Sequence, residues 1–397
     1  MGRRASFHAW SLRGDAQRKV GMSEKTKKLT KAKEVKNDEF YTQYADIQKE
    51  VNAYLDFDEN VFRGKTVLLP CDDPEWSNFT KFFAQNFERF GLKKLISTSF
   101  APEAKSKKYG GDMSLYAYAQ ENNGGAPDNE RGRIYVLDHD TNRNGRIDIE
   151  DLEWEYLKGD GDFRSDEVRR LRDEADVIVT NPPFSIFLDF FTWLMESKKQ
   201  FLVLCNKGAV SYKEVFPYIR GNKIWAGRTE WAGGMWFETI DETDVDKVID
   251  GKKMKNVASV WLTNIEHGRR HLPLLLMTMA ENIKHSSHKD VKDVGYLHYD
   301  NYDAIDIPHV DSIPSDYDGV MGVPISFLDK YCPEQFKLIG IGTGDNGREL
   351  GVVKNYRGRT DLAITENGKH RCPFTRILIQ RKKSCKATCR SGKGKGK

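Results

Sequence analysis

The chain has 397 residues, of which 39% are hydrophobic and 31% are charged, and its mean hydropathy is −0.65. The longest apolar run, near Leu274 to Met279, is far shorter than the ~18 residues of a membrane-spanning helix. Residues 1–20 lack the apolar core of a signal peptide. These features exclude a membrane protein and favour a cytoplasmic one. The six cysteines form no CxxC pair and are too sparse for a disulfide scaffold, which agrees with a reducing compartment.

The net charge of +4 is unevenly distributed along the chain. Residues 1–36 carry eleven Lys or Arg against three acids, and residues 381–397 carry eight Lys or Arg and no acid. The two ends therefore hold +16 and residues 37–380 hold −12. Such ends are typical of solvated, disordered tails, and Met22 is an alternative start of the protein. A folded part of negative net charge binds a polyanion only through a local basic face.

Short apolar runs rich in β-branched residues predict strands. They are Thr66–Leu69, Lys94–Ser99, Ile134–Leu137, Val177–Thr180 and Phe201–Cys205. Apolar residues at helical spacing predict helices over Trp76–Phe90 and, after a Pro-Pro start, Phe184–Met195. Strand, turn and helix thus occur twice, which indicates an α/β fold. In an open parallel sheet, ligands bind beyond the carboxyl ends of the strands.

The pattern changes after about residue 250. Pro308, Pro314 and Pro324 separate short segments there, which favours a second, less regular domain. Before it, Pro102–Gly132 contains lysines and glycines without periodicity and reads as a long loop. No repeat of 20–50 residues is visible, which excludes solenoids and propellers.

The segment Asp176-Val-Ile-Val-Thr-Asn-Pro-Pro-Phe184 is the strongest chemical signal. Its apolar strand ends in Asn-Pro-Pro, where two prolines fix φ and remove two backbone donors, so that carbonyls face outward beside an amide side chain. Such a corner accepts hydrogen bonds from an NH2 group. Two acceptors on a conjugated amine favour its sp3 form and stabilise the positive charge that develops as it attacks. Phe184 supplies a flat face for a planar group. The alternative is a turn that only starts a helix.

Five segments together resemble the EcoRI-type adenine-specific DNA methyltransferases, over about residues 37 to 380. They are Asn37-Asp-Glu-Phe-Tyr-Thr42, Leu69-Pro-Cys-Asp-Asp-Pro-Glu-Trp-Ser-Asn-Phe79, Asp162-Phe-Arg-Ser165, Asn181-Pro-Pro-Phe184 and Val323-Pro-Ile-Ser-Phe-Leu-Asp-Lys-Tyr331. The resemblance implies an S-adenosylmethionine-dependent methyltransferase domain over residues 37–250, with a Rossmann-like sheet and helices on both faces. A target-recognition region would follow at 251–380. The implied substrate is double-stranded DNA, in which an adenine is flipped out and methylated at N6. A cognate restriction endonuclease is a possible partner, without a stable complex.

The resemblance also implies roles for single residues. The catalytic residues would be Asn181, Pro182, Pro183 and Phe184. The cofactor would be held by Tyr41 and Thr42 at its methionine end, by Cys71, Asp72 and Asp73 after the first strand, and by Asp162 and Phe163 at its adenine. The chain departs from most methyltransferases because no Gly-x-Gly turn follows its first strand. No acid ends the strand Lys94–Ser99 either.

Basic residues beyond the sheet are candidates for DNA contacts. Arg228, Lys354, Arg357 and Arg359 are the main ones, and the wider set adds Arg220, Lys223, Arg371 and Arg376. The interleaved aromatic residues Trp225, Trp231, Trp236, Phe237 and Tyr356 offer stacking faces. For any one of these arginines, a solvated charge without a partner is the alternative.

Three further motifs have a competing interpretation. The glycine-rich run Gly340–Gly347 is read as a β-hairpin turn, although a permuted order of motifs would make it the missing cofactor loop. Asp140–Asp151 fits a calcium-loop template, but a strand precedes it, so a polar hairpin tip is favoured over cation binding. His267 and His271 have helical metal spacing without an acid between them, so we expect a basic surface and no metal.

Two other functions stay open at this point. An RNA-base or protein-glutamine amino methyltransferase would share the Asn-Pro-Pro-aromatic corner. A non-catalytic DNA- or calcium-binding protein would explain the missing glycines and the loop Asp140–Asp151.

Overall fold

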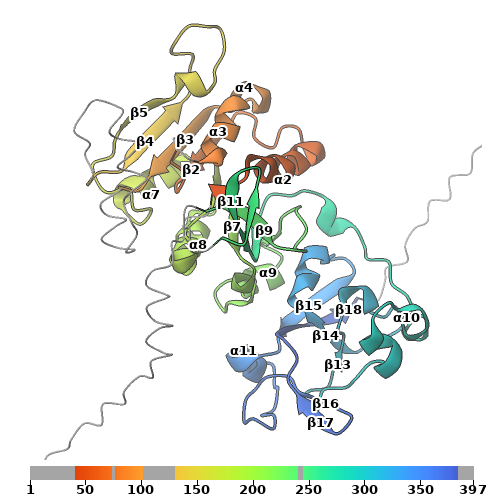
Figure 1. Ribbon diagram of the computed structural model, residues 1–397. Helices are drawn as coiled ribbons and strands as arrows, with labels where there is room; N and C mark the ends of the chain where they lie inside the picture. Colours follow the sequence, from red (N-terminus) through yellow and green to blue (C-terminus); the bar gives the residue numbers. More distant parts are fainter. Residues whose placement is uncertain (1–40, 74–76, 102–129, 240–244, 383–397) are drawn as a thin grey trace, which may run out of the picture.

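A computed structural model describes residues 41–73, 77–101, 130–239 and 245–382. Its centre is an eight-stranded mixed sheet with the order β5-β4-β3-β2-β6-β7-β12-β8 (Figure 1). These strands are β2 (Thr66–Leu69), β3 (Lys94–Ser99), β4 (Arg133–Leu137), β5 (Glu153–Tyr156), β6 (Val177–Thr180), β7 (Gln200–Asn206), β8 (Trp225–Ala226) and β12 (Ser259–Thr263). The four central strands, β3, β2, β6 and β7, are parallel, and β4, β5 and β12 pair antiparallel to their neighbours. The predicted α/β class is confirmed.

Helices cover both faces of this sheet. Alternate residues of β2 point to opposite sides, so that Val67 and Leu69 join one buried apolar cluster and Leu68 joins another. The first face is covered by α2 (Tyr44–Phe57), α3 (Asn78–Gln85) and α4 (Phe87–Phe90). The second face is covered by α7 (Asp166–Glu174), α8 (Phe187–Ser197) and α9 (Phe216–Arg220). Burial on both faces explains why these strands read as continuous apolar runs.

The helix predicted over Trp76–Phe90 is divided in the structure. α3 ends at Gln85, and α4 begins after Asn86, whose side-chain amide donates to the carbonyl of Phe82 at 2.8 Å. Asn86 is therefore a local stop signal that the apolar spacing does not reveal. Trp76 lies outside the described residues, as do residues 1–36, most of the expected loop Pro102–Gly132 and the second basic end from residue 383.

A four-stranded sheet lies against the central one and has the order β1-β9-β11-β10. It consists of β1 (Tyr41–Thr42), β9 (Met235–Glu238), β10 (Lys247–Ile249) and β11 (Lys252–Val257). Strands β11 and β12 follow residue 250, where the first domain was expected to end. Because β12 pairs with β7 along five residues, the central sheet continues past residue 250 to Thr263.

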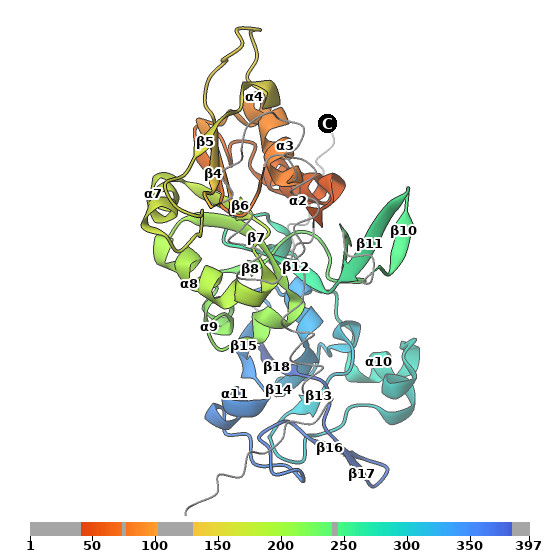
Figure 2. The same cartoon turned by 60° about the vertical axis from the view of Figure 1, so that its left-hand side comes forward.

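The rest of the chain forms a second part below the central sheet (Figure 2). Its core is a four-stranded sheet with the order β13-β14-β18-β15, made by β13 (Ile305–Asp306), β14 (Val320–Pro324), β15 (Phe336–Ile341) and β18 (Arg376–Arg381). The hairpin β16 (Ile364–Glu366) and β17 (Lys369–Arg371) and the helices α10 (Met279–His285) and α11 (Gly344–Glu349) flank it. This part is more regular than the proline spacing suggested.

Short helical turns complete the described chain: η1 (Ile149–Asp151), η2 (Phe184–Ile186), η3 (Lys207–Ser211), η4 (Arg269–His271), η5 (Asp290–Val294), η6 (Val310–Ser312) and η7 (Ile325–Lys330). One apolar cluster runs from the second face of the central sheet into the β14, β15 and β18 sheet, so the two parts share a continuous core. No described helix combines the length and apolarity that a membrane crossing demands.

Candidate active site at the carboxyl edge of the central sheet

Two turns lie side by side at the carboxyl edge of the central sheet. Strands β2 and β6 are parallel neighbours, with Leu68 opposite Ile178, so the turn after β2 adjoins the turn after β6. The first turn carries Cys71, Asp72 and Asp73, and the second carries Asn181-Pro-Pro-Phe184. A hydrogen bond joins them, from Thr180 Oγ1 to Asp72 Oδ2 at 2.5 Å. The two predicted corners are therefore adjacent in space.

The second turn leads directly from a strand into a helix. Pro183 is extended (φ −57°, ψ 126°), η2 begins at Phe184, and α8 follows from Phe187. Asn181 is half-buried with its side-chain oxygen shielded from solvent, and Phe184 packs against the apolar cluster of the first face. The predicted helix after the prolines is confirmed, apart from its opening 3-10 turn. The corner combines a fixed backbone with an amide and an aromatic ring.

The carboxylate of Asp72 is turned into the protein. Asp72 is 4% exposed, and its two oxygens accept hydrogen bonds from the hydroxyls of Ser77, at 2.8 Å, and Thr180. Burial raises the pKa of Asp72 to about 7, because the charged form loses water; the two hydroxyls oppose this rise and the nearby Asp73 adds to it. The resemblance placed Asp72 on the cofactor, whereas its described partners are side chains of the protein.

Hydroxyl groups shape the turn after β2. Thr98 Oγ1 donates to the carbonyl of Pro70 at 3.0 Å, and Thr80 Oγ1 donates to the carbonyl of Asp72 at 3.2 Å. Ser97 Oγ also donates to that carbonyl, and the amide of Asp72 donates to the carbonyl of Thr98 at 3.2 Å. These contacts fix the turn without the usual glycines. These contacts were not predicted from the sequence, although the polar end of the strand, Ser97-Thr98-Ser99, is a visible signal.

Asp162 lies beyond the end of β3. The carbonyl of Asp160 accepts from the amide of Ala101 at 2.8 Å, which ties this loop to the strand. Gly161 has φ +80°, and a Cβ there would come within 2.3 Å of the carbonyl oxygen of Ser99, so only glycine fits. Asp162 thus reaches the same edge of the sheet as Asp72.

Phe163 has a different environment from its neighbour Asp162. It is 5% exposed, and its ring packs edge to face against Phe190 and Trp193 of α8, with centroids 5.3 and 5.7 Å away. The ring belongs to the core under the site. The cofactor role assigned to Phe163 stays a prediction.

Thr42 provides a test of whether a polar ligand fits this edge. It is 4% exposed in β1, and Asn78 Nδ2 donates to its carbonyl at 2.8 Å, which holds it near the start of α3. No described residue offers a hydrogen-bond partner to its buried Oγ1. A ligand at this edge could satisfy that hydroxyl, so the residues present fit a polar cofactor. The side chain of Tyr41 lies outside the described part.

Arg228 lies in a loop whose backbone is held by a buried carboxylate. Glu50 is fully buried, and its carboxylate accepts from the amides of Arg228 and Thr229 at 2.6 and 2.7 Å and from Thr229 Oγ1 at 2.6 Å. A Cβ on Gly227 would come within 2.3 Å of Glu50 Oε1. The backbone is therefore held while the Arg228 side chain is exposed. This arrangement suits a contact with an anion.

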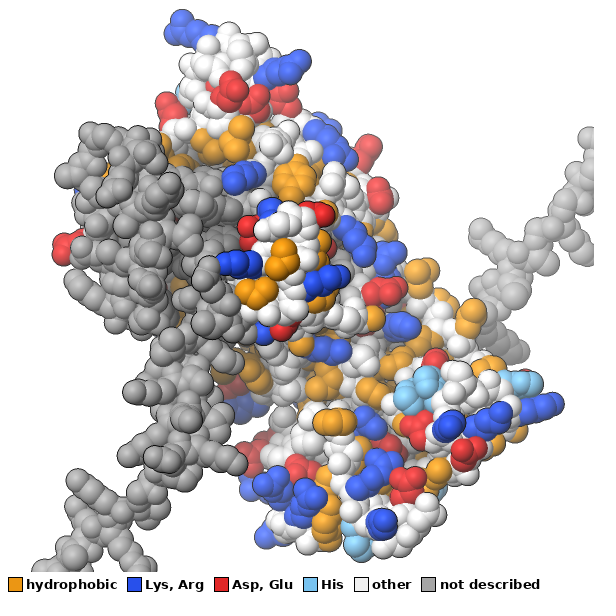
Figure 3. Space-filling view, viewed as in Figure 1, with side chains coloured by type: hydrophobic (Ala, Val, Ile, Leu, Met, Phe, Trp, Pro, Cys, Tyr) orange, Lys and Arg blue, Asp and Glu red, His pale blue; other side chains and the backbone are white. Residues whose placement is uncertain are grey.

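Lys354, Arg357 and Arg359 share one loop after α11. All three are exposed, and the side-chain oxygen of Asn355 accepts from the amides of Arg357 and Arg359 at 2.8 and 3.3 Å. Tyr356 stacks on His370 of β17 with centroids 5.3 Å apart. Lys and Arg side chains gather at the lower left of the molecule, near α11 and the loop below it (Figure 3). No described hydrogen bond or ion pair joins this loop to the corner Asn181-Pro-Pro-Phe184.

Several other candidates for DNA contacts have internal roles. Arg376 is 8% exposed and pairs with the buried Asp306 at 2.8 Å, so its assignment to a DNA surface is wrong. Arg371 pairs with Glu366 at 2.9 Å, and Arg220 donates to the carbonyl of Ile339 at 3.3 Å. Lys223 lies over the ring of Tyr218. Trp231 and Phe237 are buried in the core, which excludes them as exposed stacking faces.

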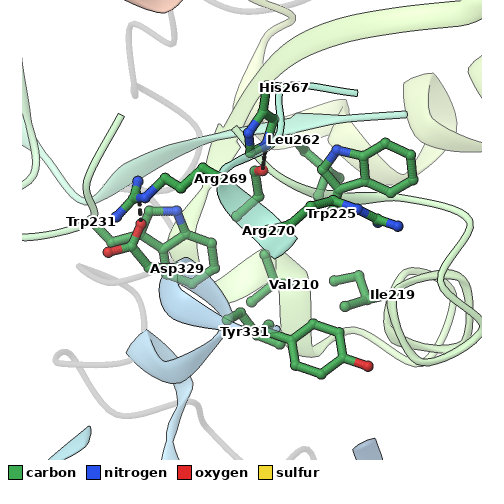
Figure 4. Close-up of a pocket in the computed structure, with 12 residues that line it drawn as sticks. Val210, Ile219, Trp225, Trp231, Leu262, His267, Arg269, Arg270, Asp329 and Tyr331 are labelled. Carbon is green, nitrogen blue, oxygen red and sulfur yellow. Dashed lines mark hydrogen bonds and ion pairs between the residues drawn. The ribbon is translucent and has the colours of Figure 1, made fainter. Parts of the chain in front are cut away.

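A pocket lies at the junction of the two parts (Figure 4). Arg270 covers Trp225 there at 3.8 Å, and Arg269 donates to the carbonyl of Arg228 and pairs with Asp329 of η7 at 3.2 Å. The lining consists of Val210, Ile219, Trp225, Ala226, Trp231, Leu262, His267, Arg269, Arg270, Leu328, Asp329 and Tyr331. Neither Asn181 nor Asp72 is among them, so this pocket is distinct from the two adjacent turns after β2 and β6.

The glycine-rich run Gly340–Gly347 does not form the expected hairpin turn. Its strand β15 pairs with β18 in the second part and leads into α11. Position 347 in this helix requires glycine, because a Cβ there would come within 2.4 Å of the carbonyl oxygen of Thr360. Since β15 does not belong to the central sheet, the permuted order of motifs is excluded as well.

The other two motifs have protein partners. Asp140 and Asp151 accept from backbone amides in the connection between β4 and β5, which confirms a polar tip. His267 Nε2 lies 2.9 Å from the carbonyl of Ala226, and His271 pairs with Glu266 and Glu334. Within the described residues, no group of three or more His, Cys, Asp or Glu side chains could hold a metal ion.

Comparison with known proteins assigns the chain to a class. The profile described as "Adenine-specific methyltransferase EcoRI" matches residues 28–382. The chain is 36% identical to the Type II methyltransferase M.EcoRI of Escherichia coli, over 90% of this chain and 97% of the relative. It is 32% identical to M.MpnI of Mycoplasma pneumoniae and 31% identical to M.MgeORF184P of Mycoplasma genitalium, over 90% and 89% of this chain and 98% of each relative. No solved structure is significantly similar.

The mixed α/β sheet with its Asn-Pro-Pro-Phe corner is therefore that of a methyltransferase. The chain belongs to the EcoRI family of adenine-specific methyltransferases. This result confirms the resemblance and the expectation of an enzyme, and it leaves no basis for a non-catalytic binding protein.

Proposed function

We propose that this enzyme transfers a methyl group from S-adenosylmethionine to N6 of an adenine in a specific sequence of double-stranded DNA. The observation that carries the proposal is the adjacency of the turns after β2 and β6, linked by the hydrogen bond between Thr180 and Asp72. This adjacency brings the candidate cofactor residues next to Asn181. The description of the family supports adenine as the methylated base, and the relatives are Type II methyltransferases.

The corner Asn181-Pro-Pro-Phe184 suits an exocyclic amine. The Asn181 side-chain oxygen and the Pro182 carbonyl accept the two hydrogens of N6, which localises its lone pair for attack, and Pro183 fixes the backbone that presents them. Phe184 stacks on the purine. Because an adenine inside the duplex cannot reach this corner, the enzyme flips it out before transfer.

S-adenosylmethionine, when bound, supplies an activated methyl group on its sulfonium sulfur. We assign its contacts to residues around the carboxyl edge. Thr42 and Tyr41 would bind the methionine end, and Cys71, Asp72 and Asp73 would border it with the turn after β2, where Asp72 acts from inside the turn. Asp162 would accept from the adenine amine, with Phe163 beneath it. Buried Thr42 Oγ1 supports this placement.

We further infer a division of labour between the two parts. The central sheet, with helices on both faces, is a Rossmann-like methyltransferase domain, and the part built on β13, β14, β15 and β18 is the region that recognises the target. Arg228 and the loop with Lys354, Arg357 and Arg359 would contact DNA, since these side chains are exposed on ordered backbone. A restriction endonuclease of the same system would act on the same sequence without a stable complex.

The test uses the purified full chain with S-adenosylmethionine carrying a labelled methyl group. Separate reactions contain amplified, unmethylated bacterial DNA, total RNA or a protein extract, and the products are hydrolysed and identified by mass spectrometry. We expect label in N6-methyldeoxyadenosine alone. Label in RNA or in glutamine would support the alternative amino methyltransferases, and label in N4-methyldeoxycytidine would contradict the choice of base.

A further inference from the structure

We propose that Asp72 is a positioning residue, which holds Asn181 in its reactive geometry through Thr180. Because the inference concerns how the catalytic corner works, it rests on the proposed function. It differs from a cofactor contact, since Asp72 would act through the protein.

The geometry places Asp72 between two elements of the site. Thr180 is the last residue of β6 and directly precedes Asn181, and its hydroxyl lies 2.5 Å from Asp72 Oδ2. Ser77 caps α3 by accepting from the amide of Phe79 at 3.1 Å, and its hydroxyl lies 2.8 Å from Asp72 Oδ1. One carboxylate thus connects the end of β6 to the start of α3.

A buried carboxylate that connects two elements destabilises the folded protein, because its charge is removed from water. Thr180 is fully buried and Ser77 is 7% exposed, so the bonds to Asp72 are shielded from water. No Lys or Arg in the described part of the chain forms an ion pair with Asp72, so hydroxyl donors alone oppose the cost of its charge. Apolar side chains would stabilise this position better, which indicates that the carboxylate serves the site.

The connection depends on the protonation state of Asp72. The ionised carboxylate accepts from both hydroxyls, whereas the protonated form carries a donor on one oxygen, so that one hydroxyl must reorient. The groups that face it are Thr180 from β6, Ser77 from α3 and Asp73 from its own turn. Its backbone is held by Ser97 of β3 and Thr80 of α3. With the pKa of Asp72 at about 7, the connection changes near neutral pH.

The decisive variant is Thr180→Val, which keeps the shape of the side chain and removes the hydroxyl. We expect kcat to fall about 10- to 100-fold, because a displaced reacting group loses about this much rate. Thr180→Ser restores the hydroxyl and should recover most of kcat. Thr263→Val is the matched control: Thr263 is also fully buried in the central sheet, with its hydroxyl 2.6 Å from the carbonyl of Phe201, and its loss should leave kcat unchanged.

A pH profile separates positioning from a general loss of stability. We expect kcat of the wild type to rise with pH through about 7 as Asp72 ionises. Thr180→Val should move this step to higher pH, since the ionised form loses a hydrogen bond. Asp72→Asn should remove the step and stay slow at every pH. Circular dichroism and calorimetric titration with S-adenosylmethionine accompany each profile.

The outcomes distinguish this inference from the proposed function. A wild type that methylates no DNA would overturn both. An active wild type with unchanged kcat in Thr180→Val, an equal loss in Thr180→Ser, or no step near pH 7 would overturn the positioning role alone. If Thr180→Val does not fold, the wild-type and Asp72→Asn profiles still decide the question.

Discussion

Arg164 donates to both carboxylate oxygens of Asp162, with Nε 2.9 Å from Oδ1 and Nη2 2.7 Å from Oδ2. The same guanidinium reaches Asp189 in the first turn of α8 at 3.2 Å. Arg164 thereby connects the loop beyond β3 to α8, the helix that follows Asn181-Pro-Pro-Phe184. A carboxylate that accepts two hydrogen bonds from one guanidinium group can still accept a further hydrogen bond from another donor.

Asp162→Ala tests whether this carboxylate binds the cofactor. We expect the dissociation constant for S-adenosylmethionine to rise tenfold to a hundredfold, because a hydrogen bond from a charged acceptor contributes roughly 1.5–3 kcal/mol. Calorimetric titration measures the change. Asp166→Ala, which removes an exposed acid from the first turn of α7, serves as control. An unchanged constant would show that Asp162 only holds Arg164.

Asp72→Asn should change how stability depends on pH. Burial raises the pKa of Asp72 from 3.8 to about 7, so the unfolded chain loses this proton at lower pH than the folded chain does. The contribution of Asp72 to stability is therefore largest below pH 4 and falls as the pH rises to 7, by ~1.4 kcal/mol per pKa unit. Asparagine stays neutral throughout.

The melting temperature of Asp72→Asn, relative to the wild type, should therefore be higher at pH 8 than at pH 5. Differential scanning calorimetry at the two pH values measures it. A relative melting temperature that does not rise between pH 5 and pH 8 would mean that the folded protein ionises this buried carboxylate without cost.

Arg357→Ala and Arg359→Ala test the recognition loop. Asn355 holds the backbone of this loop, so truncation of either side chain should leave its shape intact. We expect relaxed specificity at one base pair, at a cost of roughly 1–3 kcal/mol. Sequencing of methylated sites reports it, with Arg348→Ala on the exposed face of α11 as control. Uniform weakening on all sequences would assign these residues to phosphate contacts.

Arg376→Met should act on stability instead of specificity. The guanidinium pairs with buried Asp306, which also accepts a hydrogen bond from Tyr299 at 2.6 Å. Removal of the guanidinium therefore leaves the charge of Asp306 uncompensated in the sheet of β13, β14, β18 and β15. Breaking such a pair costs about 3–5 kcal/mol. Urea denaturation measures the loss, and Arg371→Ala at the exposed pair with Glu366 should cost under about 1 kcal/mol. An Arg376→Met variant of wild-type stability would contradict the structural role.

The sequence predicted the four parallel strands of the central sheet and β4, because their residues are mostly buried, but it did not predict β5, β8 or β12. Thr66–Leu69, Lys94–Ser99 and Val177–Thr180 have the predicted bounds, since each short segment combines buried apolar residues with β-branched ones, which is typical of a strand covered on both faces. Local packing decided the cases that failed. Gly347 lies within α11 at a place where the Thr360 carbonyl leaves no room for a Cβ, and Asn86 divides a helix whose apolar spacing is continuous. Neither interaction is visible in periodicity.

The site was predictable where one motif contains it. Asn181-Pro-Pro-Phe184 is contiguous, whereas the contact of Asp72 with Thr180 joins residues that are 108 positions apart in the sequence. Arg376 was predicted as a DNA contact from its charge alone, because the sequence does not show that Asp306 lies beside it. Contacts between residues that are far apart in the sequence are visible only in the folded structure.

The most direct test of the account is the single-turnover rate of methyl transfer by the wild type and by Asn181→Ala, with saturating S-adenosylmethionine and unmethylated DNA. We expect the wild type to form N6-methyldeoxyadenosine. We expect Asn181→Ala to be about 100- to 1000-fold slower, because it lacks one preorganised hydrogen-bonding group. Its affinity for S-adenosylmethionine should be unchanged. A rate within threefold of the wild type would contradict the catalytic role of this corner.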